Sequence, residues 1–398
     1  MYPDFSYLFH DLFGTQPDNI ASIVKTFGFF LAAGVGVLAY FFKIELQRKA
    51  KEGIFQPVPV IQIEGAAPTI GDILGNALMG LLLGMKIPYI YQHFKEFQID
   101  PASAIFSMKG NIVLGLILAA AFGYWRYWDG ERKKITPPKR TKVNVYPHDK
   151  ITEIAMIAAF SGILGAKVFD ILEHLDSFVK DPVGVFLSGS GLAIYGGLIF
   201  GFIAVVWYLR KNFPGISILH AMDAVAPSLI LGYGTGRIGC QLSGDGDWGI
   251  PVKGVTKAGV EYAYHQPSWV PDFLWSQTYP HNIAGDGITL PDCTYNYCNV
   301  LPTGVFPTPL YEIILSVTIF AILWMLRKRL KTAGTLFFVF MILDGLERFF
   351  IEKIRVNIQY EKFGLHFTQA QFIAIGMIIL GIIGIVWRMK ASKKTTIT

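Results

Sequence analysis

Residues 224–249 read AVAPSLILGYGTGRIGCQLSGDGDWG, and this stretch decides the class of the fold. It begins as an apolar run and carries an arginine, Arg237, where lipid would surround it. A charged side chain at membrane depth is costly, so it usually faces a cavity and a partner. The neighbouring glycines let the backbone approach another group and expose N–H donors that an anion can use. The stretch therefore indicates a site for an anionic head group or, alternatively, a kinked helix end with a structural arginine.

The composition is that of a polytopic membrane protein. Hydrophobic residues make up 52% of the 398 residues and charged residues only 16%, whereas soluble domains typically carry about 25% charge. The net charge is +6, but the basic residues lie in short runs beside apolar segments, which is the pattern of the positive-inside rule. We therefore expect an all-α polytopic membrane protein and no nucleic-acid partner.

Nine segments of about 20 residues, the length that a bilayer requires, are apolar enough to be candidate transmembrane helices. Lysines and arginines gather in alternate loops, which predicts that the N-terminus lies outside and the C-terminus in the cytoplasm. The segment 71–93 is interrupted by Lys86 and Pro88 and is therefore a candidate for a re-entrant or interfacial helix. The candidate spans are 19–42, 71–93, 103–125, 151–173, 186–209, 219–240, 308–326, 333–352 and 368–387.

The loop 242–306 is the long external segment in this topology. It is rich in Pro, Gly, Asp, Trp and Tyr and has no apolar run long enough to span, so we expect a small external head. Cys293 and Cys298 lie close together in it, and an external loop is where a disulfide survives. The chain then divides into an external N-terminus with the first helix (1–42), a segment with two candidate spans and basic cytoplasmic loops (43–150), core helices (151–241), the head loop (242–306), and C-terminal core helices with a cytoplasmic tail (307–398).

A second group of charges lies on an otherwise apolar helix near the C-terminal end. Arg348 and Glu352 are one helical turn apart, so they lie on one face and can pair. Arg355 follows them, and Asp344 and Glu347 add acid to the same helix. Either this is a self-satisfied structural ion pair, or the charges serve a function.

Two further features have both a functional and a structural interpretation. Tyr195 is followed by Gly196 and Gly197 in the middle of a predicted span. The tyrosine can present its hydroxyl to a cavity, but small residues also pack helices together in membranes. Tyr311, near the start of another span, is either part of a site or an aromatic-belt residue.

Taken together, these pieces resemble the prolipoprotein diacylglyceryl transferase family, because several motifs recur in the family's order. Four positions depart from the family pattern. Tyr195 replaces its frequent histidine, Cys240 an asparagine, Asp344 a tyrosine, and Phe27 an N-terminal tyrosine. The matching elements are GILGAK at 162–167, YGGL at 195–198, Asp223, Pro227 and GRIG at 236–239 with Trp248 and Gly249, PTPLYE at 307–312, and RFFIE at 348–352 followed by Arg355.

The resemblance implies a multi-pass protein of the bacterial cytoplasmic (inner) membrane, with a seven-helix family core and two extra spans in residues 43–150. It implies transfer of the diacylglyceryl group of phosphatidylglycerol to the thiol of the lipobox cysteine in the signal peptide of a preprolipoprotein. Membrane lipids and this peptide are then its partners, and no metal or other cofactor is expected. The departing glycerol phosphate is an anion whose developing charge fixed arginines stabilise.

The resemblance also implies roles for individual residues. Arg237 and Arg348 act on the phosphate, Glu352 orients Arg348, and Tyr195 lies near the reacting centre, while the proton acceptor stays unassigned. Two other classes of function remain open on the residues alone: a non-catalytic channel or transporter, and another phospholipid head-group enzyme. The catalytic candidates are Arg237, Arg348 and Tyr195, and the substrate-binding candidates are Arg237, Gly236, Gly239, Gly196, Gly197, Glu352, Arg355 and Tyr311.

Overall fold

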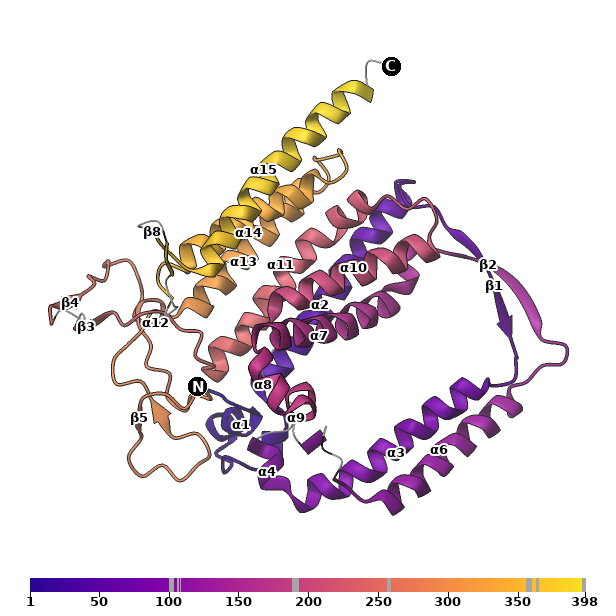
Figure 1. Cartoon of the computed structure of the whole chain (residues 1–398), viewed down its shortest axis with the longest axis horizontal. Coiled ribbons are helices and arrows are strands. Elements are labelled where there is room, and N and C mark those ends of the chain that lie inside the picture. The colour runs from indigo at the N-terminus through magenta and orange to yellow at the C-terminus, as the bar shows by residue number, and fades with distance from the viewer. Residues whose placement is uncertain are drawn as a thin grey trace. The chain divides into compact units, whose positions relative to one another are not determined.

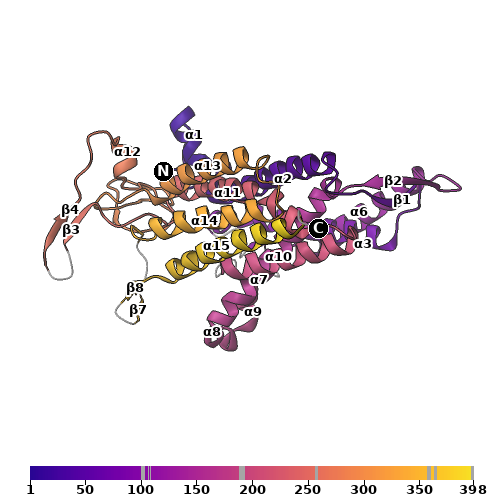
Figure 2. The ribbon, with the colours of Figure 1, turned by 90° about the horizontal axis from the view of Figure 1, so that it is seen from above.

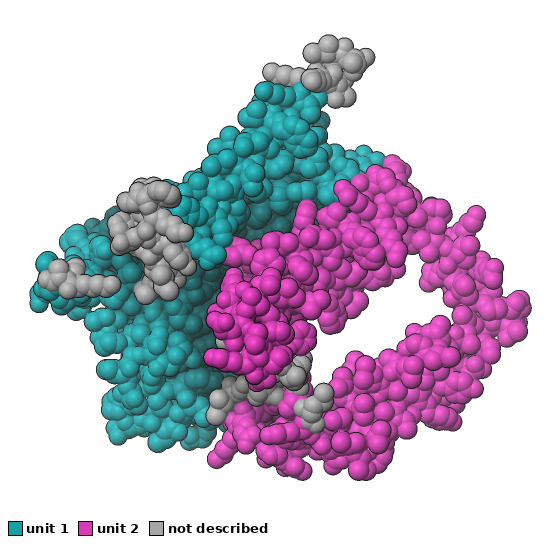
Figure 3. All heavy atoms as spheres, in the orientation of Figure 1, with its two compact units in different colours: residues 1–55, 217–398 teal, residues 56–216 magenta. Residues whose placement is uncertain are grey.

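The protein is mostly helical and falls into two compact units, each of which is described by itself (Figures 1 and 3). The first unit combines Met1–Phe55 with Ser217–Thr398, and the second is Gln56–Ile216. The computed structural model describes residues 1–99, 104–105, 107, 109–187, 193–255, 259–355, 360–362 and 365–395.

The first unit is organised around α11 (Ile218–Ser243). This helix packs against α2 (Thr26–Lys51) and α13 (Thr308–Leu326), and it also contacts α14 (Thr335–Ile351). The C-terminal helix α15 (Gln369–Thr395) packs along α14. Figure 2 shows these helices running alongside one another. Segments from both ends of the sequence therefore surround the arginine-bearing helix.

Glycines let α11 approach its neighbours closely. A Cβ added to Gly34 of α2 would lie 2.7 Å from the carbonyl oxygen of Gly232, and one added to Gly234 would lie 2.7 Å from Cβ of Ser316 on α13. These separations are too short for a side chain, so the backbones meet through small residues, as is common between membrane helices. The glycine-rich sequence before Arg237 thus has a packing role on two sides of the helix.

The loop after α11 forms a small folded head with its own apolar core of Trp248, Tyr279, Leu301 and Val305. Cys293 and Cys298 are disulfide-bonded, as expected. Its regular elements are β3 (Lys253–Val255), β4 (Glu261–Ala263), α12 (Asp272–Trp275), β5 (Ile288–Thr289) and β6 (Asn299–Val300), and the rest of the unit adds α1 (Phe5–Phe13), the 3₁₀ turn η1 (Ile20–Ile23), β7 (Tyr360–Lys362) and β8 (Leu365–Phe367).

The second unit contains two helix pairs. Helices α3 (Ile70–Gln92) and α6 (Ile112–Arg132) pack together, as do α7 (Ile151–Glu173) and α10 (Ile194–Asn212). Two strands that pair antiparallel flank this first helix pair in the sequence: one precedes α3 and the other follows α6. The strands are β1 (Val58–Glu64) and β2 (Lys139–Val145), and the unit also has η2 (Pro147–Lys150), α4 (Phe94–Ile99), α8 (Leu175–Lys180) and α9 (Pro182–Leu187).

Helix α3 is continuous through Lys86 and Pro88, the two residues that interrupt its apolar sequence. The Lys86 ammonium donates to the carbonyl oxygens of Ala104, at 2.9 Å, and Lys109, at 3.0 Å, and it also reaches Ser107. A cation in an apolar helix is tolerated here because the chain after the helix supplies acceptors for it.

Helices overlap all nine predicted spans, although parts of 103–125 and 186–209 lie outside the described residues. The first expected span, 19–42, is shifted, because residues 20–23 form the turn η1 and α2 begins at Thr26. Within the described residues, five helical segments are long and apolar enough to cross a membrane, which is consistent with a polytopic membrane protein. They are Thr26–Lys51, Ile70–Gln92, Pro147–Glu173, Thr308–Leu326 and Gln369–Ala391.

Candidate active site

Arg237 and Arg348 converge on one buried carboxylate, although they come from different helices. Nε of Arg237 on α11 lies 2.9 Å from Glu312, and Nη1 of Arg348 on α14 lies 3.3 Å from the same residue. The hydroxyl of Tyr233 donates to Glu312 at 2.8 Å and accepts from Arg237 at 3.2 Å and from Arg348 at 3.4 Å. The two arginines that were expected to act together therefore belong to one hydrogen-bonded cluster.

Glu312 is the centre of this cluster and is fully buried. It lies on α13 and ends the PTPLYE motif, and Arg355 also approaches it, at 3.9 Å. The motif was identifiable from the sequence, but a site role for Glu312 or Tyr233 was not predicted. A glutamate near the start of a strongly apolar helix was a signal for Glu312, since a buried carboxylate needs a cationic partner.

A second carboxylate, Asp247, bridges two of the arginines from the loop that follows α11. One oxygen binds Arg237 and the other binds Arg355. Burial by itself would raise the pKa of Asp247, but the positive charges of Arg237 and Arg355 outweigh it and hold the pKa below its usual value. The backbone carbonyl of Asp247 accepts a hydrogen bond from Thr308 at 2.6 Å. Thr308 thus anchors the backbone of Asp247, and Glu312 of the same motif is the other carboxylate of the cluster.

The ion pairs of the cluster contain one more cation than anion, and the carboxylates of Asp245, Asp344 and Glu347 also interact with its arginines. Its ion pairs join three guanidinium groups, those of Arg237, Arg348 and Arg355, to the two carboxylates of Glu312 and Asp247. Guanidinium groups match the fork geometry of phosphate oxygens. These five groups therefore make a preorganised anion-binding arrangement between α11, α13 and the end of α14.

Glu352 lies one helical turn after Arg348, at the C-terminal end of α14. It is buried at the end of α14, and its backbone N–H donates to the carbonyl of Arg348 at 3.1 Å. The carboxylate that binds the Arg348 guanidinium is Glu312. Arg348 is thus held by a contact between two helices, because α13 and α14 pack together.

The two candidate glycines of α11 have different surroundings. A Cβ added to Gly239 would lie 3.1 Å from Cα of Phe27, so Gly239 allows the start of α2 to pack closely. A Cβ added to Gly236 would meet no atom within 4 Å in the part of the chain that the structure describes. Gly236 therefore leaves open space one residue before Arg237.

Tyr195, Gly196 and Gly197 lie in the second unit, in the first turn of α10. A Cβ added to Gly197 would lie 3.0 Å from the carbonyl oxygen of Gly162, and Gly196 packs against Gly165 of the same helix, α7. Helix packing therefore accounts for both glycines, and it fixes the part of α10 from which the Tyr195 side chain projects.

Tyr311 and Asp223 connect elements of the first unit. The Tyr311 hydroxyl donates to the backbone carbonyl of Leu274 in α12 and so ties the head to α13. Asp223 of α11 accepts from the backbone N–H groups of Gly334, at 2.7 Å, and Phe337, at 3.0 Å. It therefore supplies the side-chain acceptors for the first turn of α14 that a capping residue would otherwise supply.

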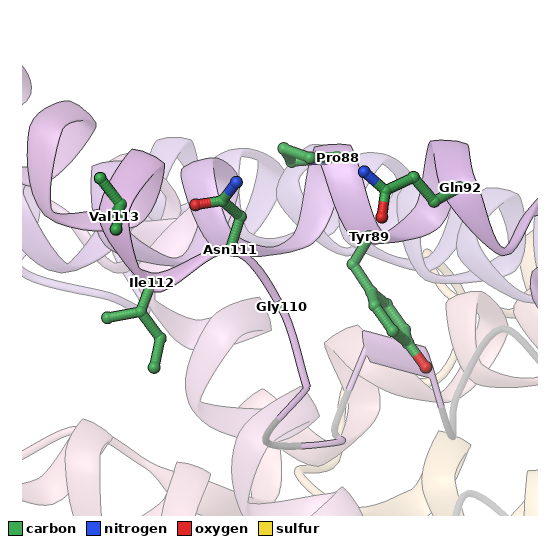
Figure 4. A pocket seen from close by; sticks show the side chains of 7 residues that line it. All are labelled: Pro88, Tyr89, Gln92, Gly110, Asn111, Ile112 and Val113. Atoms are coloured by element: carbon green, nitrogen blue, oxygen red, sulfur yellow. The ribbon is translucent and has the colours of Figure 1, made fainter.

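Two other places have the geometry of a ligand site. A pocket of about 410 Å³ lies in the second unit at one end of α3 and α6, and none of the described residues that line it is charged (Figure 4). Cys240, Asp245 and Asp247 lie close enough together to share a metal ion, but two guanidinium groups already bind Asp247, and their charge disfavours a cation. The arginine cluster is the stronger candidate.

A family model and several known proteins are similar to this chain. A family model described as prolipoprotein diacylglyceryl transferase matches residues 110–387, and the match begins within the segment 43–150 and so includes α6. A phosphatidylglycerol–prolipoprotein diacylglyceryl transferase of Dehalococcoides mccartyi is 26% identical over 309 residues, covering 75% of this chain and 97% of the relative. Proteins of the same description from Clostridium tetani (29% over 247 residues, 61% of this chain and 83% of the relative) and Oceanobacillus iheyensis (30% over 245 residues, 61% and 74%) are also similar.

Proposed function

The chain belongs to the prolipoprotein diacylglyceryl transferase family, and we propose that Arg237, Arg348 and Arg355 form its binding site for the phosphate of the lipid donor. The protein transfers the diacylglyceryl group from phosphatidylglycerol to prolipoproteins. The observation that carries the site is the convergence of three arginines on Glu312 and Asp247, with one positive charge in excess among these five groups.

The chemistry uses this charge directly. The thiol of the lipobox cysteine loses its proton and attacks the glyceryl carbon that bears the phosphate. A C–S bond forms, the C–O bond to phosphate breaks, and glycerol phosphate departs with the bonding electrons. The leaving group gains negative charge as the bond breaks, so guanidinium groups held in place beforehand stabilise the transition state more than the ground state. A positive field also favours the thiolate of the attacking cysteine.

Other residues have supporting roles in this proposal. Glu312 holds the arginines in position, and Glu352 supports Arg348 at the end of its helix. The open space beside Gly236 lets the lipid head group approach Arg237. Tyr195 donates a hydrogen bond to the lipid, a role that rests on its place in the family's motif.

We place the protein in the bacterial cytoplasmic membrane with nine spans. The N-terminus (1–42) and the head (242–306) face the outside, whereas the tail of the last segment (307–398) and the basic loops of 43–150 face the cytoplasm. The disulfide between Cys293 and Cys298 supports an external head, because such bonds persist in oxidising compartments. Two of the spans lie in 43–150, and the second of them, α6, falls within the residues that the family model matches.

A channel or transporter is the weaker alternative, since the family model and the similar proteins all carry transferase descriptions. Purified protein, phosphatidylglycerol and a lipobox peptide test the proposal together. The peptide mass should rise by one diacylglyceryl group, and Arg348→Ala should abolish the rise. Arg210→Ala, an exposed arginine at the end of α10, is the matched control and should keep full activity. Ion flux through proteoliposomes without any mass change would refute the transferase.

A further inference from the structure

Asp247 binds the arginines in a different way from Glu312. Its two carboxylate oxygens bind two separate guanidinium groups, Oδ2 to Arg237 and Oδ1 to Arg355. The two free oxygens of a phosphodiester can make the same pair of bonds to two guanidinium groups. A carboxylate and a phosphate therefore compete for the same donors.

We propose that Asp247 is an internal anion that competes with the donor's phosphate for Arg237 and Arg355, and so sets the enzyme's affinity for anionic lipids. This inference rests on the proposed function of the arginine cluster and goes beyond it, because it assigns a role to a residue that repels the substrate. Asp247 is a specificity-determining residue in this account, and it is not a group that reacts.

The two carboxylates of the cluster differ in their freedom to move. Glu312 has no exposed surface and lies within a helix, whereas the Asp247 side chain is 32% exposed and lies in a loop. The loop backbone is held firmly, because Thr308 binds the Asp247 carbonyl and Gly249 N–H donates to Phe306 at 2.8 Å. Release of the two arginines therefore requires only rotation of the Asp247 side chain.

Charge explains why this rotation matters. While the Asp247 carboxylate binds the arginines, a phosphate that reaches Arg237 is attracted by the guanidinium group but repelled by the carboxylate. Like charges brought together at a binding site weaken binding. An anionic donor must therefore displace the carboxylate, whereas a neutral side chain of the same shape at position 247 would leave both guanidinium groups available.

The test compares wild type with Asp247→Asn and Asp247→Glu. In the peptide assay we expect Asp247→Asn to lower KM for phosphatidylglycerol by about tenfold, because the like charge is gone, with no gain in kcat. Inorganic phosphate, used as a probe, should inhibit Asp247→Asn at a concentration about tenfold lower than wild type, for the same reason. Asp247→Glu keeps the charge and should keep a KM near that of wild type.

Asp245→Asn is the matched control. Asp245 lies two residues away in the same loop and accepts from the backbone N–H of Asp247 at 3.2 Å. Its substitution also removes a carboxylate near Arg237, but the two donors bound by Asp247 stay bound, so KM should fall by less than it does for Asp247→Asn.

Each outcome bears on one proposal. If wild type transfers no diacylglyceryl group, the proposed function fails. If wild type is active and KM of Asp247→Asn is unchanged or higher, only the role of Asp247 as a competitor fails. If Asp247→Asn does not fold, Asp247→Ser is measured instead. Failure of both neutral variants to fold would show that Asp247 is a structural ion-pair partner and would overturn the inference.

Discussion

Glu312 is the residue that turns three separate arginines into one cluster. It has no exposed surface, and it binds Arg237, Arg348 and the hydroxyl of Tyr233. Burying a charge is tolerated only when partners and hydrogen bonds compensate for lost hydration. The cost of removing Glu312 therefore includes the cost of leaving the arginines buried without their partner.

We expect Glu312→Gln to destabilise the protein by about 3–5 kcal/mol, because it breaks a buried ion pair by removing one partner. It should also reduce the rate of transfer by at least about a hundredfold, since the guanidinium groups are no longer held in position. Unfolding in mixed detergent micelles and the peptide assay measure the two effects.

The surface pair of Arg48 and Glu52 provides the control for this prediction. Its atoms are 2.7 Å apart, but the glutamate side chain is 46% exposed. Glu52→Gln should cost less than about 1 kcal/mol, as exposed pairs do. Equal losses for Glu52→Gln and Glu312→Gln would contradict the central role of Glu312.

Tyr195 is the residue whose role rests most on the resemblance. A phenol hydroxyl is a good hydrogen-bond donor, so a hydrogen bond to the lipid is the favoured role. Tyr195→Phe should then lower kcat/KM by roughly tenfold for each 1.4 kcal/mol that the bond contributes. A loss of several orders of magnitude would indicate a base, and full activity with unchanged affinity for phosphatidylglycerol would indicate packing alone.

At the scale of elements, α11 positions the site because it packs between two other helices. Gly34 of α2 faces the Gly232 carbonyl, and Gly234 faces Ser316 of α13. Asp223, near the other end of α11, binds the first turn of α14. The same helix that carries Arg237 therefore fixes the helix that carries Arg348.

Two glycines of α2 provide a matched test of this packing. A Cβ at Gly34 would lie 2.7 Å from a backbone oxygen, whereas a Cβ at Gly36 would meet nothing within 4 Å among the described residues. Gly34→Ala should lower stability by about 1–3 kcal/mol, the usual cost of overpacking. Gly36→Ala should be neutral or slightly stabilising, since alanine favours helix. Thermal unfolding in detergent measures both, and equal stability of the two variants would argue against close packing of α2 on α11.

At the scale of the whole molecule, we propose that the head faces the outside of the membrane. The ordered core of the head and its disulfide fit that location.

Chemical labelling of single introduced cysteines tests this topology. Ser268 is exposed in the head and Lys331 is exposed in the loop between α13 and α14. A membrane-impermeant maleimide should label Ser268→Cys in sealed right-side-out vesicles, and Lys331→Cys only after the vesicles are opened. The native background is low, because Cys293 and Cys298 are bonded and Cys240 is buried. Labelling of Lys331→Cys in sealed vesicles would reverse the orientation.

The sequence by itself determined the class of the fold and the kind of chemistry. Apolar segments of bilayer length predict helices, because backbone groups in lipid must bond within their own segment. Arg237 and Arg348 were identifiable because a charged side chain in an apolar helix is costly and usually has a function. The Cys293–Cys298 pair was identifiable because the two cysteines lie close together in one long polar loop.

Only the tertiary structure decided the partners. The spacing of Arg348 and Glu352 suggested a pair within one helix, yet Arg348 binds Glu312 of another helix. Asp247 in the glycine-rich loop gave no sign that it bridges Arg237 and Arg355. Helical periodicity shows which residues share a face, but it does not show which face of another helix will meet them. That choice depends on close backbone contacts, such as Gly34 on Gly232, between residues far apart in the chain.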